Sequence, residues 1–223
     1  MFALAHIPRS TRVLAETSLL QINRAHTTAP DILHAFHRAP PDRQTSYLQL
    51  TSYAGPKFRR AAAHEMQRSW PSLPAAHRRV LEIWAANTLG DVFLLGSRFN
   101  HSCAPNVNFA WNTKLQKQTS HAVRDIAAGE ELTVMYNNGI NRMRAQRQGE
   151  LEERGFVCAC AACGTSRLDF RVKDDMRNAL FQHDQVLGMA LRRRDWEQAR
   201  KSAQALAGIQ FREGFWVREL SRS

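Results

Sequence analysis

Residues 98–106 read Arg-Phe-Asn-His-Ser-Cys-Ala-Pro-Asn, and this stretch decides how the rest of the chain is interpreted. Two further pieces follow it in order. The first is Gly129-Glu130-Glu131-Leu132 with Tyr136 four residues later, and the second is Cys158-x-Cys160-x-x-Cys163. Taken singly, Asn100 is an ordinary turn residue and His101 an ordinary buried side chain. It is the order and spacing of the three pieces together that indicate a fold and a function.

Cysteine usage points to a metal. The chain has four cysteines, and three of them, Cys158, Cys160 and Cys163, fall within six residues. A disulfide framework would space its cysteines to close loops in a small secreted domain, whereas thiols this close together suit a metal. Structural zinc sites use four ligands in a tetrahedron. Ordinary free thiols and an iron–sulfur cluster remain alternatives at this stage.

Composition sets broad limits. At 223 residues and 43% hydrophobic, the chain can bury one sizeable core with a small appendage. No run approaches the roughly 20 apolar residues that span a bilayer, so no membrane association is expected. The net charge of +11 has no block of five or six like charges and is read as a solvated surface. With no basic region ahead of the first apolar residues, a secretory signal is not expected, and metal-type cysteines favour an intracellular protein.

Hydrophobic patterns predict short strands around a helical insertion. Residues 11–22 fit one or two strands broken near Glu16. Residues 26–78 are punctuated by six prolines and predict short helical pieces. One helical face is then expected to carry Val80, Ile83, Trp84 and Asn87. Alternation at Val107, Phe109 and Trp111 predicts a half-buried strand, followed by strands near 118–124 and 131–136.

The carboxyl-terminal part is predicted to be helical. Residues 141–154 are polar and helix-compatible, and the last 50 residues read as two helices packed as an antiparallel hairpin. Two apolar stripes are expected to form the packed faces of these helices. They consist of Met176, Leu180, Leu187 and Leu191 on the first helix and Trp196, Ala199, Ala203 and Leu206 on the second.

The three opening motifs together resemble the carboxyl half of a SET domain, the fold of S-adenosylmethionine-dependent lysine methyltransferases. The layout is similar to the SMYD-like subgroup, including fungal forms without a MYND finger, whose SET domain is split by a helical insertion. The resemblance implies an α+β fold, mainly a β SET fold with short antiparallel sheets. It implies a SET domain over 1–137 with an insertion at about 23–85, a zinc-bound post-SET segment over 138–165, and a helical region over 166–223.

The same resemblance assigns the site. Tyr136 matches the catalytic tyrosine, Asn100 and His101 match a pair that contacts the cofactor, and Phe156 matches an aromatic that stacks on adenine. Tyr136 also borders the cofactor. The four zinc ligands implied by the family pattern are Cys103, Cys158, Cys160 and Cys163. The acidic pair Glu130 and Glu131 is interpreted as part of a structural turn that needs Gly129.

Two departures from the family pattern affect the expected activity. Relatives begin with a Gly-x-Gly turn that approaches the cofactor, and this chain enters just after it, at Met1-Phe2-Ala3. The expectation is therefore an N-terminal truncation or a reduced cofactor cradle. The second departure is Arg154, where some relatives place a further channel tyrosine. A cation there would repel a protonated lysine and alter substrate choice.

These features predict a SET-type protein-lysine N-methyltransferase that uses S-adenosylmethionine and Zn²⁺. The expected partner is a protein that presents a lysine, histone or non-histone, with no requirement for nucleic acid. The expected state is a monomer in the nucleus or cytoplasm. The alternative is a catalytically impaired, zinc-stabilised interaction module derived from a SET domain. A nucleic-acid-binding zinc protein ranks last because the cysteines lack paired finger spacing.

Overall fold

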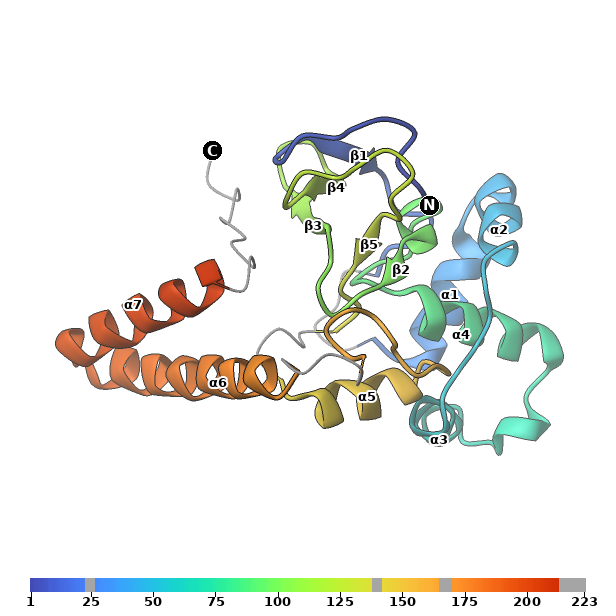
Figure 1. Cartoon of the computed structure of the whole chain (residues 1–223). Coiled ribbons are helices and arrows are strands. Elements are labelled where there is room, and N and C mark those ends of the chain that lie inside the picture. Colours follow the sequence, from blue (N-terminus) through green and yellow to red (C-terminus); the bar gives the residue numbers. More distant parts are fainter. Residues whose placement is uncertain (23–26, 138–141, 165–169, 213–223) are drawn as a thin grey trace.

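The computed structural model describes residues 1–22, 27–137, 142–164 and 170–212. In the last of these ranges, side chains are described only for residues 174–209. Small sheets occupy the centre, with helices on two sides (Figure 1). In chain order the elements are β1 (Arg12–Glu16), α1 (Ala29–Arg38), α2 (Pro41–Leu48), α3 (Pro56–Glu65), a 3-10 turn (Trp70–Ser72), α4 (Ala75–Asn87), a 3-10 turn (Gly96–Arg98), β2 (Asn100–His101), β3 (Val107–Asn112), β4 (Lys117–Ala122), β5 (Thr133–Val134), α5 (Arg144–Glu152), α6 (Phe170–Arg193) and α7 (Trp196–Arg212).

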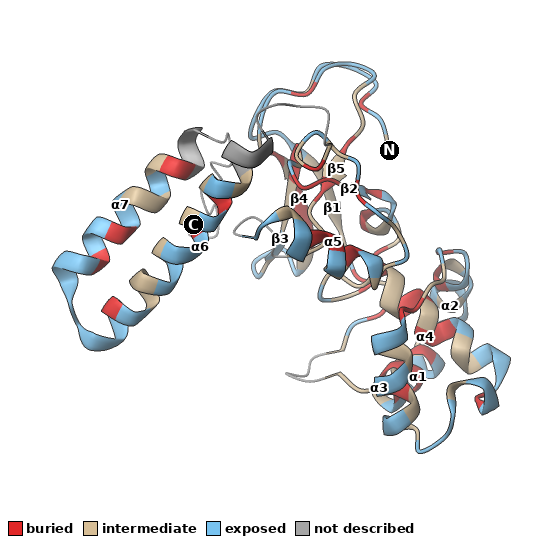
Figure 2. Ribbon diagram, turned by 60° about the horizontal axis from the view of Figure 1, so that its bottom comes forward, coloured by how far each residue is buried: buried red, intermediate tan, exposed pale blue. Residues whose placement is uncertain are grey.

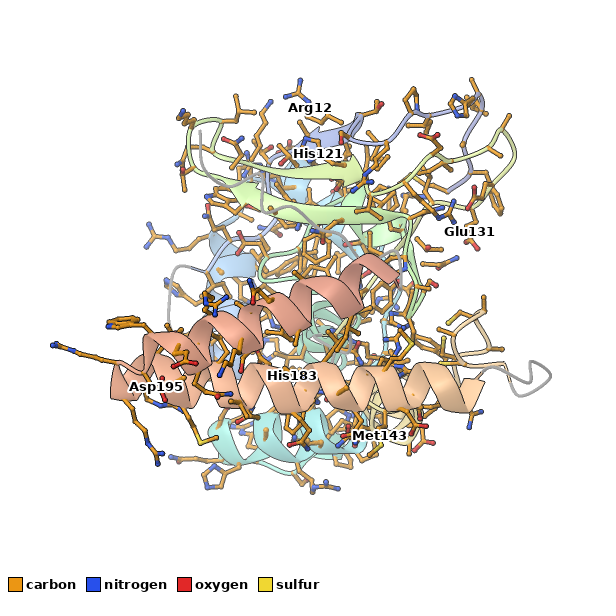
Figure 3. The ribbon with its side chains drawn as sticks, turned by 60° about the vertical axis from the view of Figure 1, so that its left-hand side comes forward. Arg12, His121, Glu131, Met143, His183 and Asp195 are labelled. Atoms are coloured by element: carbon orange, nitrogen blue, oxygen red, sulfur yellow. The ribbon has the colours of Figure 1, made fainter. Side chains whose placement is uncertain are left out.

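The larger sheet is antiparallel, in the order β1-β4-β3. Its register pairs Arg12 with His121 at one end of β1, and Figure 3 shows these two side chains together at that edge. The predicted break after Glu16 is present, since the chain leaves β1 there. The α+β fold with small sheets is confirmed.

The smaller sheet positions the functional motifs. β2 and β5 run parallel, with Asn100 opposite Thr133 and His101 opposite Val134. The expectation of antiparallel sheets therefore holds for the larger sheet only. Parallel pairing brings residues 100–101 beside the segment that leads to Tyr136, although Asn100 and Glu131 are 31 positions apart in the sequence. The pairing of β2 with β5 therefore brings the first two sequence motifs together in space.

Four helices form the insertion between β1 and β2. Prolines begin these helices rather than break them, because Pro41 and Pro56 occupy first helical positions where no N–H bond is lost. Thr28 and Asp31 form a reciprocal capping box at the start of α1. The predicted face of α4 is buried as expected, and the buried Tyr47 hydroxyl donates to the Val80 carbonyl at 2.9 Å.

The two C-terminal helices form an antiparallel hairpin that projects from the body (Figure 2). Its packed interior includes Leu180, Ala190, Ala199 and Ile209. The predicted stripes were wrong at Leu191 and Trp196, which are 50% and 65% exposed, and at Ala203 in the middle of α7, which is also exposed. The hairpin turns beside Leu191 and Trp196, at Asp195 in Figure 3, so these two side chains have no further layer to pack on. Across the described residues, no helix is long and apolar enough to span a bilayer.

Candidate active site and metal centre

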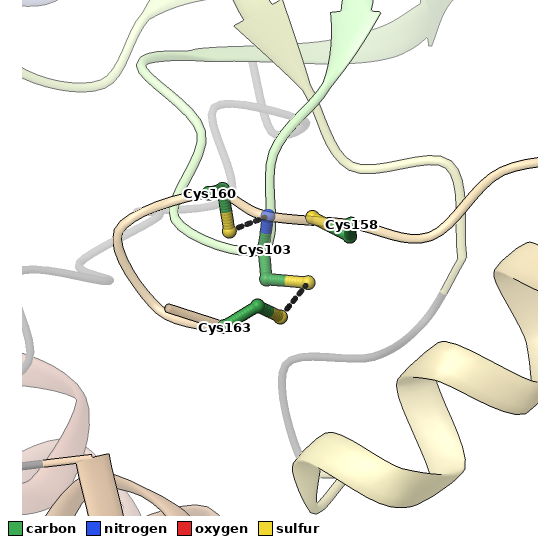
Figure 4. Close-up of side chains that lie close together, drawn as sticks. All are labelled: Cys103, Cys158, Cys160 and Cys163. Carbon is green, nitrogen blue, oxygen red and sulfur yellow. Dashed lines mark hydrogen bonds between the residues drawn. The ribbon is translucent and has the colours of Figure 1, made fainter. Parts of the chain in front are cut away.

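The four cysteines converge at one point (Figure 4). Cys103 comes from the loop after β2, and the other three come from the loop after α5. Their sulfur atoms all lie within 4.8 Å of one another, and the Cys103 and Cys163 sulfurs are 3.5 Å apart. At a Zn–S distance of about 2.3 Å, the sulfurs of a tetrahedral zinc site are about 3.8 Å apart. The donor set and its spacing therefore fit a tetrahedral thiolate metal site.

The protonation of these thiols also favours a metal. Hydrogen bonds from the Cys103 and Cys158 thiols hold the pKa of Cys160 well below its usual range and lower the pKa of Cys163 to about 6. Hydrogen bonds with the other three cysteines raise the pKa of Cys103. The cluster thus shares its protons unevenly, and part of it ionises readily. A thiolate is the form that binds a metal.

Helix α5 supports the cysteine loop. The Gln148 side chain clamps Cys158, accepting from its N–H at 2.9 Å and donating to its carbonyl at 2.6 Å. Arg144 donates to the Cys163 carbonyl at 2.7 Å, and Arg147 donates to the Ala162 carbonyl at 3.2 Å. Sequence reasoning did not single out these residues. In the sequence they are simply polar residues of one predicted helix, and such residues usually face solvent.

His101 connects the cysteine cluster to Tyr136. Its Nε2 lies 3.2 Å from the Cys103 sulfur, and its Nδ1 accepts the Tyr136 main-chain N–H at 3.0 Å. An imidazole that accepts at Nδ1 carries its proton at Nε2 and is neutral. Burial lowers the pKa of His101 to about 4, and the neighbouring Arg154 and Arg147 cations add to this effect. His101 is therefore a neutral bridge in this structure.

Three aromatic rings gather beside the cluster. The ring centre of His101 is 5.3 Å from that of Tyr136 and 6.0 Å from that of Phe156. The Tyr136 hydroxyl donates to the Phe99 carbonyl at 2.7 Å. Burial raises the pKa of Tyr136, which keeps the phenol protonated. These rings border a pocket of about 520 Å³, whose lining also includes Asn100, Glu131, Arg154, Cys158 and Cys160.

The two adjacent glutamates, Glu130 and Glu131, point in different directions and have different partners. Glu130 accepts from Arg124, from the Asn106 side chain at 3.1 Å and from the Ala127 N–H at 3.0 Å, which braces the turn. Glu131 instead accepts from the Asn100 side chain at 2.6 Å and lines the pocket. Glu131 thus fixes the orientation of Asn100, a contact that the sequence did not indicate.

Arg154 places a cation inside the pocket. Its guanidinium carbon lies 5.3 Å from the centre of the Tyr136 ring, and its nitrogens reach the carbonyls of Ala86 at 3.3 Å and Tyr136 at 3.4 Å. The following Gly155 has φ +85 and lies against the Tyr53 ring, so the backbone next to Arg154 is fixed. The insertion thereby contributes to one wall of the pocket.

The aromatic pocket beside β2 and β5 adjoins a four-cysteine centre that joins the loop after β2 to the loop after α5, an arrangement typical of a SET domain. The SET domain family profile matches residues 1–137 of the 223, and the chain belongs to this family. It is 35% identical over 178 residues to the histone-lysine N-methyltransferase set5 of Schizosaccharomyces pombe, covering 79% of this chain and 50% of that protein. It is 36% identical over 118 residues to the histone-lysine N-methyltransferase SET5 of Candida albicans, covering 49% of this chain and 22% of that protein.

A less similar relative is matched over a larger share of its own length. The putative SET domain-containing protein L678 of Acanthamoeba polyphaga mimivirus is 22% identical over 205 residues, covering 81% of this chain and 80% of that protein. The chain spans about half the length of the Schizosaccharomyces pombe relative and less of the Candida albicans one.

Proposed function

We propose that this chain is a protein-lysine N-methyltransferase of the SET type that uses S-adenosylmethionine. The observation that carries the proposal is the pocket in which Tyr136, His101, Asn100 and Phe156 meet beside the cysteine centre. Membership of the SET family supports the same assignment, as do the names of the fungal relatives, which are histone-lysine N-methyltransferases. The SMYD-like layout, with an insertion between β1 and β2 and helices after the cysteines, is compatible with it.

The reaction is a displacement at a methyl carbon. A lysine ε-amine forms the new N–C bond while the S–C bond of the sulfonium donor breaks, leaving a neutral thioether and an ammonium that loses a proton. The protein's task is to align both reactants, because no covalent intermediate is needed. The Tyr136 hydroxyl and the Phe99 carbonyl place two oxygen atoms 2.7 Å apart, and Tyr136 lines the pocket. Such oxygens favour a polarised methyl through C–H···O contacts of about 0.5–1 kcal/mol each.

The remaining pocket residues are assigned to donor binding. The Asn100 side chain and the backbone at His101 lie on β2 at the pocket wall, and we assign them to the polar groups of the donor. Phe156 is two residues before Cys158, so the cysteine centre holds its ring in place, and we assign it to stacking on adenine.

We assign Zn²⁺ to Cys103, Cys158, Cys160 and Cys163. A four-thiolate zinc site is structural, with no open position for substrate. It would fasten the segment that carries Phe156 to the loop that carries Asn100 and His101. Metal binding would therefore be coupled to formation of the pocket.

The proposed acceptor is a lysine on a protein. The fungal relatives are named histone-lysine N-methyltransferases, which makes histone tails the first candidates. We propose that the protein acts in the nucleus, the cytoplasm or both, where such substrates occur. We further propose that the chain acts as a monomer.

A direct test is incubation of the zinc-loaded protein with S-adenosylmethionine and lysine-containing histone peptides, followed by mass spectrometry. The proposal predicts peptides heavier by one or more methyl substitutions, located on lysine. The same peptides with lysine replaced by arginine are the control. Binding of the donor product without any transfer to histones or to a proteome-wide peptide library would favour the impaired interaction module.

A further inference from the structure

Two guanidinium groups are buried beside the cysteine cluster. Arg147 of α5 is 0% exposed and Arg177 of α6 is 1% exposed. A fully buried cation is costly unless negative charge or well-placed acceptors compensate for lost hydration. Their positions therefore need a physical reason.

Both groups contact the cysteines directly. Arg147 places one nitrogen 3.6 Å from the Cys163 sulfur, and Arg177 donates to the Cys103 carbonyl at 2.9 Å. The two cations thus approach the cluster through two of the cysteines, one on each of the loops that form it.

Helix α6 is joined to this centre by a second residue. One Asp174 oxygen lies 3.3 Å from an Arg147 nitrogen, and both Asp174 oxygens accept the Arg144 main-chain N–H, at 2.8 and 2.9 Å. Asp174 and Arg177 are three residues apart and share one helical face. Through them the first turns of α6 contact the cysteine loop and its supporting helix. The rest of α6 and α7 extends outward as the projecting hairpin (Figures 1 and 2).

A bound divalent ion would set the charge at this point. One divalent ion and four thiolates together carry two negative charges, because each ligating thiol gives up its proton. A dianionic centre in a buried site attracts nearby cations strongly, since little water screens the interaction.

We propose that Arg147 and Arg177 form the cationic outer layer of the metal centre, and that metal binding secures α6, and with it the α6–α7 hairpin, to the SET core. The inference rests on the metal site proposed above and is independent of methyl transfer. Arg147 and Arg177 are positioning residues here. Outer contacts of this kind commonly change metal affinity by 10–100-fold when removed.

The test compares hydrogen–deuterium exchange of the full chain with and without zinc, for the wild type and for Arg177→Met. In the wild type, removing zinc should speed amide exchange in α6 and α7. With zinc bound, Arg177→Met should exchange in these helices like the zinc-free wild type. Without zinc, the variant and the wild type should exchange alike. Chelator competition should show zinc affinity about tenfold weaker for the variant.

Two further variants serve as controls. Arg192→Met removes an exposed cation from the far end of α6 and should leave both measurements unchanged. Arg177→Lys keeps the charge and should retain most of the zinc-dependent protection. If Arg177→Met does not fold, Arg177→Gln replaces it, because it also removes the positive charge and is expected to give the same result.

Several results would overturn the proposal. Equal acceleration by Arg177→Met with and without zinc would mean that Arg177 only packs. If amide exchange in α6 and α7 of the wild type were the same with and without zinc, the metal would not secure the hairpin. Failure of the protein to bind zinc would remove the basis of the link. None of these readouts uses the methyl donor, so they stand apart from failure of the proposed activity.

Discussion

The hydroxyl of Tyr136 donates to the main-chain carbonyl of Phe99 at 2.7 Å, so the phenol is fixed at the pocket wall by a backbone oxygen that a side-chain mutation leaves in place. This contact ties the Gly-Glu-Glu motif to the Asn-His motif. Tyr136 therefore has two contacts, since its ring packs against the core and its oxygen is held by the Phe99 carbonyl.

Tyr136→Phe should remove the oxygen and keep the ring. We expect methyl transfer to slow by about 10²–10³-fold, the range seen when one preorganised polar group is removed from a reacting centre. Affinity for S-adenosylhomocysteine should change by less than about threefold, because the ring still fills its place. Single-turnover assays and calorimetry measure the two quantities. An unchanged rate would remove Tyr136 from the mechanism.

Arg154→Met should relieve repulsion between the pocket cation and an incoming ammonium. Two like charges about 7 Å apart at an effective dielectric of 20 repel by about 2 kcal/mol, and partial exposure reduces this. The KM for a lysine peptide at neutral pH should therefore fall by about three- to tenfold. Arg60→Met, on the exposed face of α3, is the matched control. A raised KM would show that Arg154 assists acceptor binding instead.

Gly155→Ala should destabilise the fold more than Gly129→Ala. Both glycines have positive φ, +85 and +80, which costs an alanine about 1 kcal/mol. At Gly155 the new methyl would also lie 2.8 Å from the Tyr53 ring, whereas at Gly129 nothing lies within 4 Å. Gly149→Ala, within α5 and equally free of neighbours, should instead stabilise by up to about 1 kcal/mol. Thermal melting of the three variants checks this order.

Glu130 should contribute to acid sensitivity. Hydrogen bonding from Arg124 lowers the pKa of Glu130 from 4.5 to about 2. A carboxyl whose pKa is depressed by folding binds its proton more readily when unfolded, so its contribution is present above pH 4.5 and lost as pH falls toward about 2. Glu130→Gln should therefore flatten the fall in melting temperature across this window. Parallel curves for the variant and the wild type would contradict it.

The local patterns predicted β1, β3, β4, β5 and the buried α4 face, but not β2, because each pattern depends on residues close in sequence. Alternation at 107–111 gave β3, and the helical spacing of Val80 and Trp84 gave the buried face of α4. The parallel pairing of β2 and β5 could not be predicted this way, since two-residue strands carry no periodicity. The exposed Trp196 shows a related limit, because an apolar stripe does not specify how far its packing partner extends.

The motif residues of the site were found because the family pattern links their types and spacings. The groups that support them were not found. Gln148, Arg147 and Arg177 are polar helix residues, and only tertiary contacts distinguish them from solvated ones. Tyr53 was missed for the same reason, since it lies in the helical insertion and contacts Gly155, which follows α5 about 100 positions later in the sequence.

The most direct test of the account is calorimetric titration of the protein with S-adenosylhomocysteine, before and after zinc is removed by a chelator. We expect one binding site per chain with zinc present and loss of binding without it, because the cysteine centre holds Phe156 and His101 in one pocket. Equal binding in both states would contradict the proposed coupling between metal and pocket. No binding in either state would contradict the proposed activity of this chain.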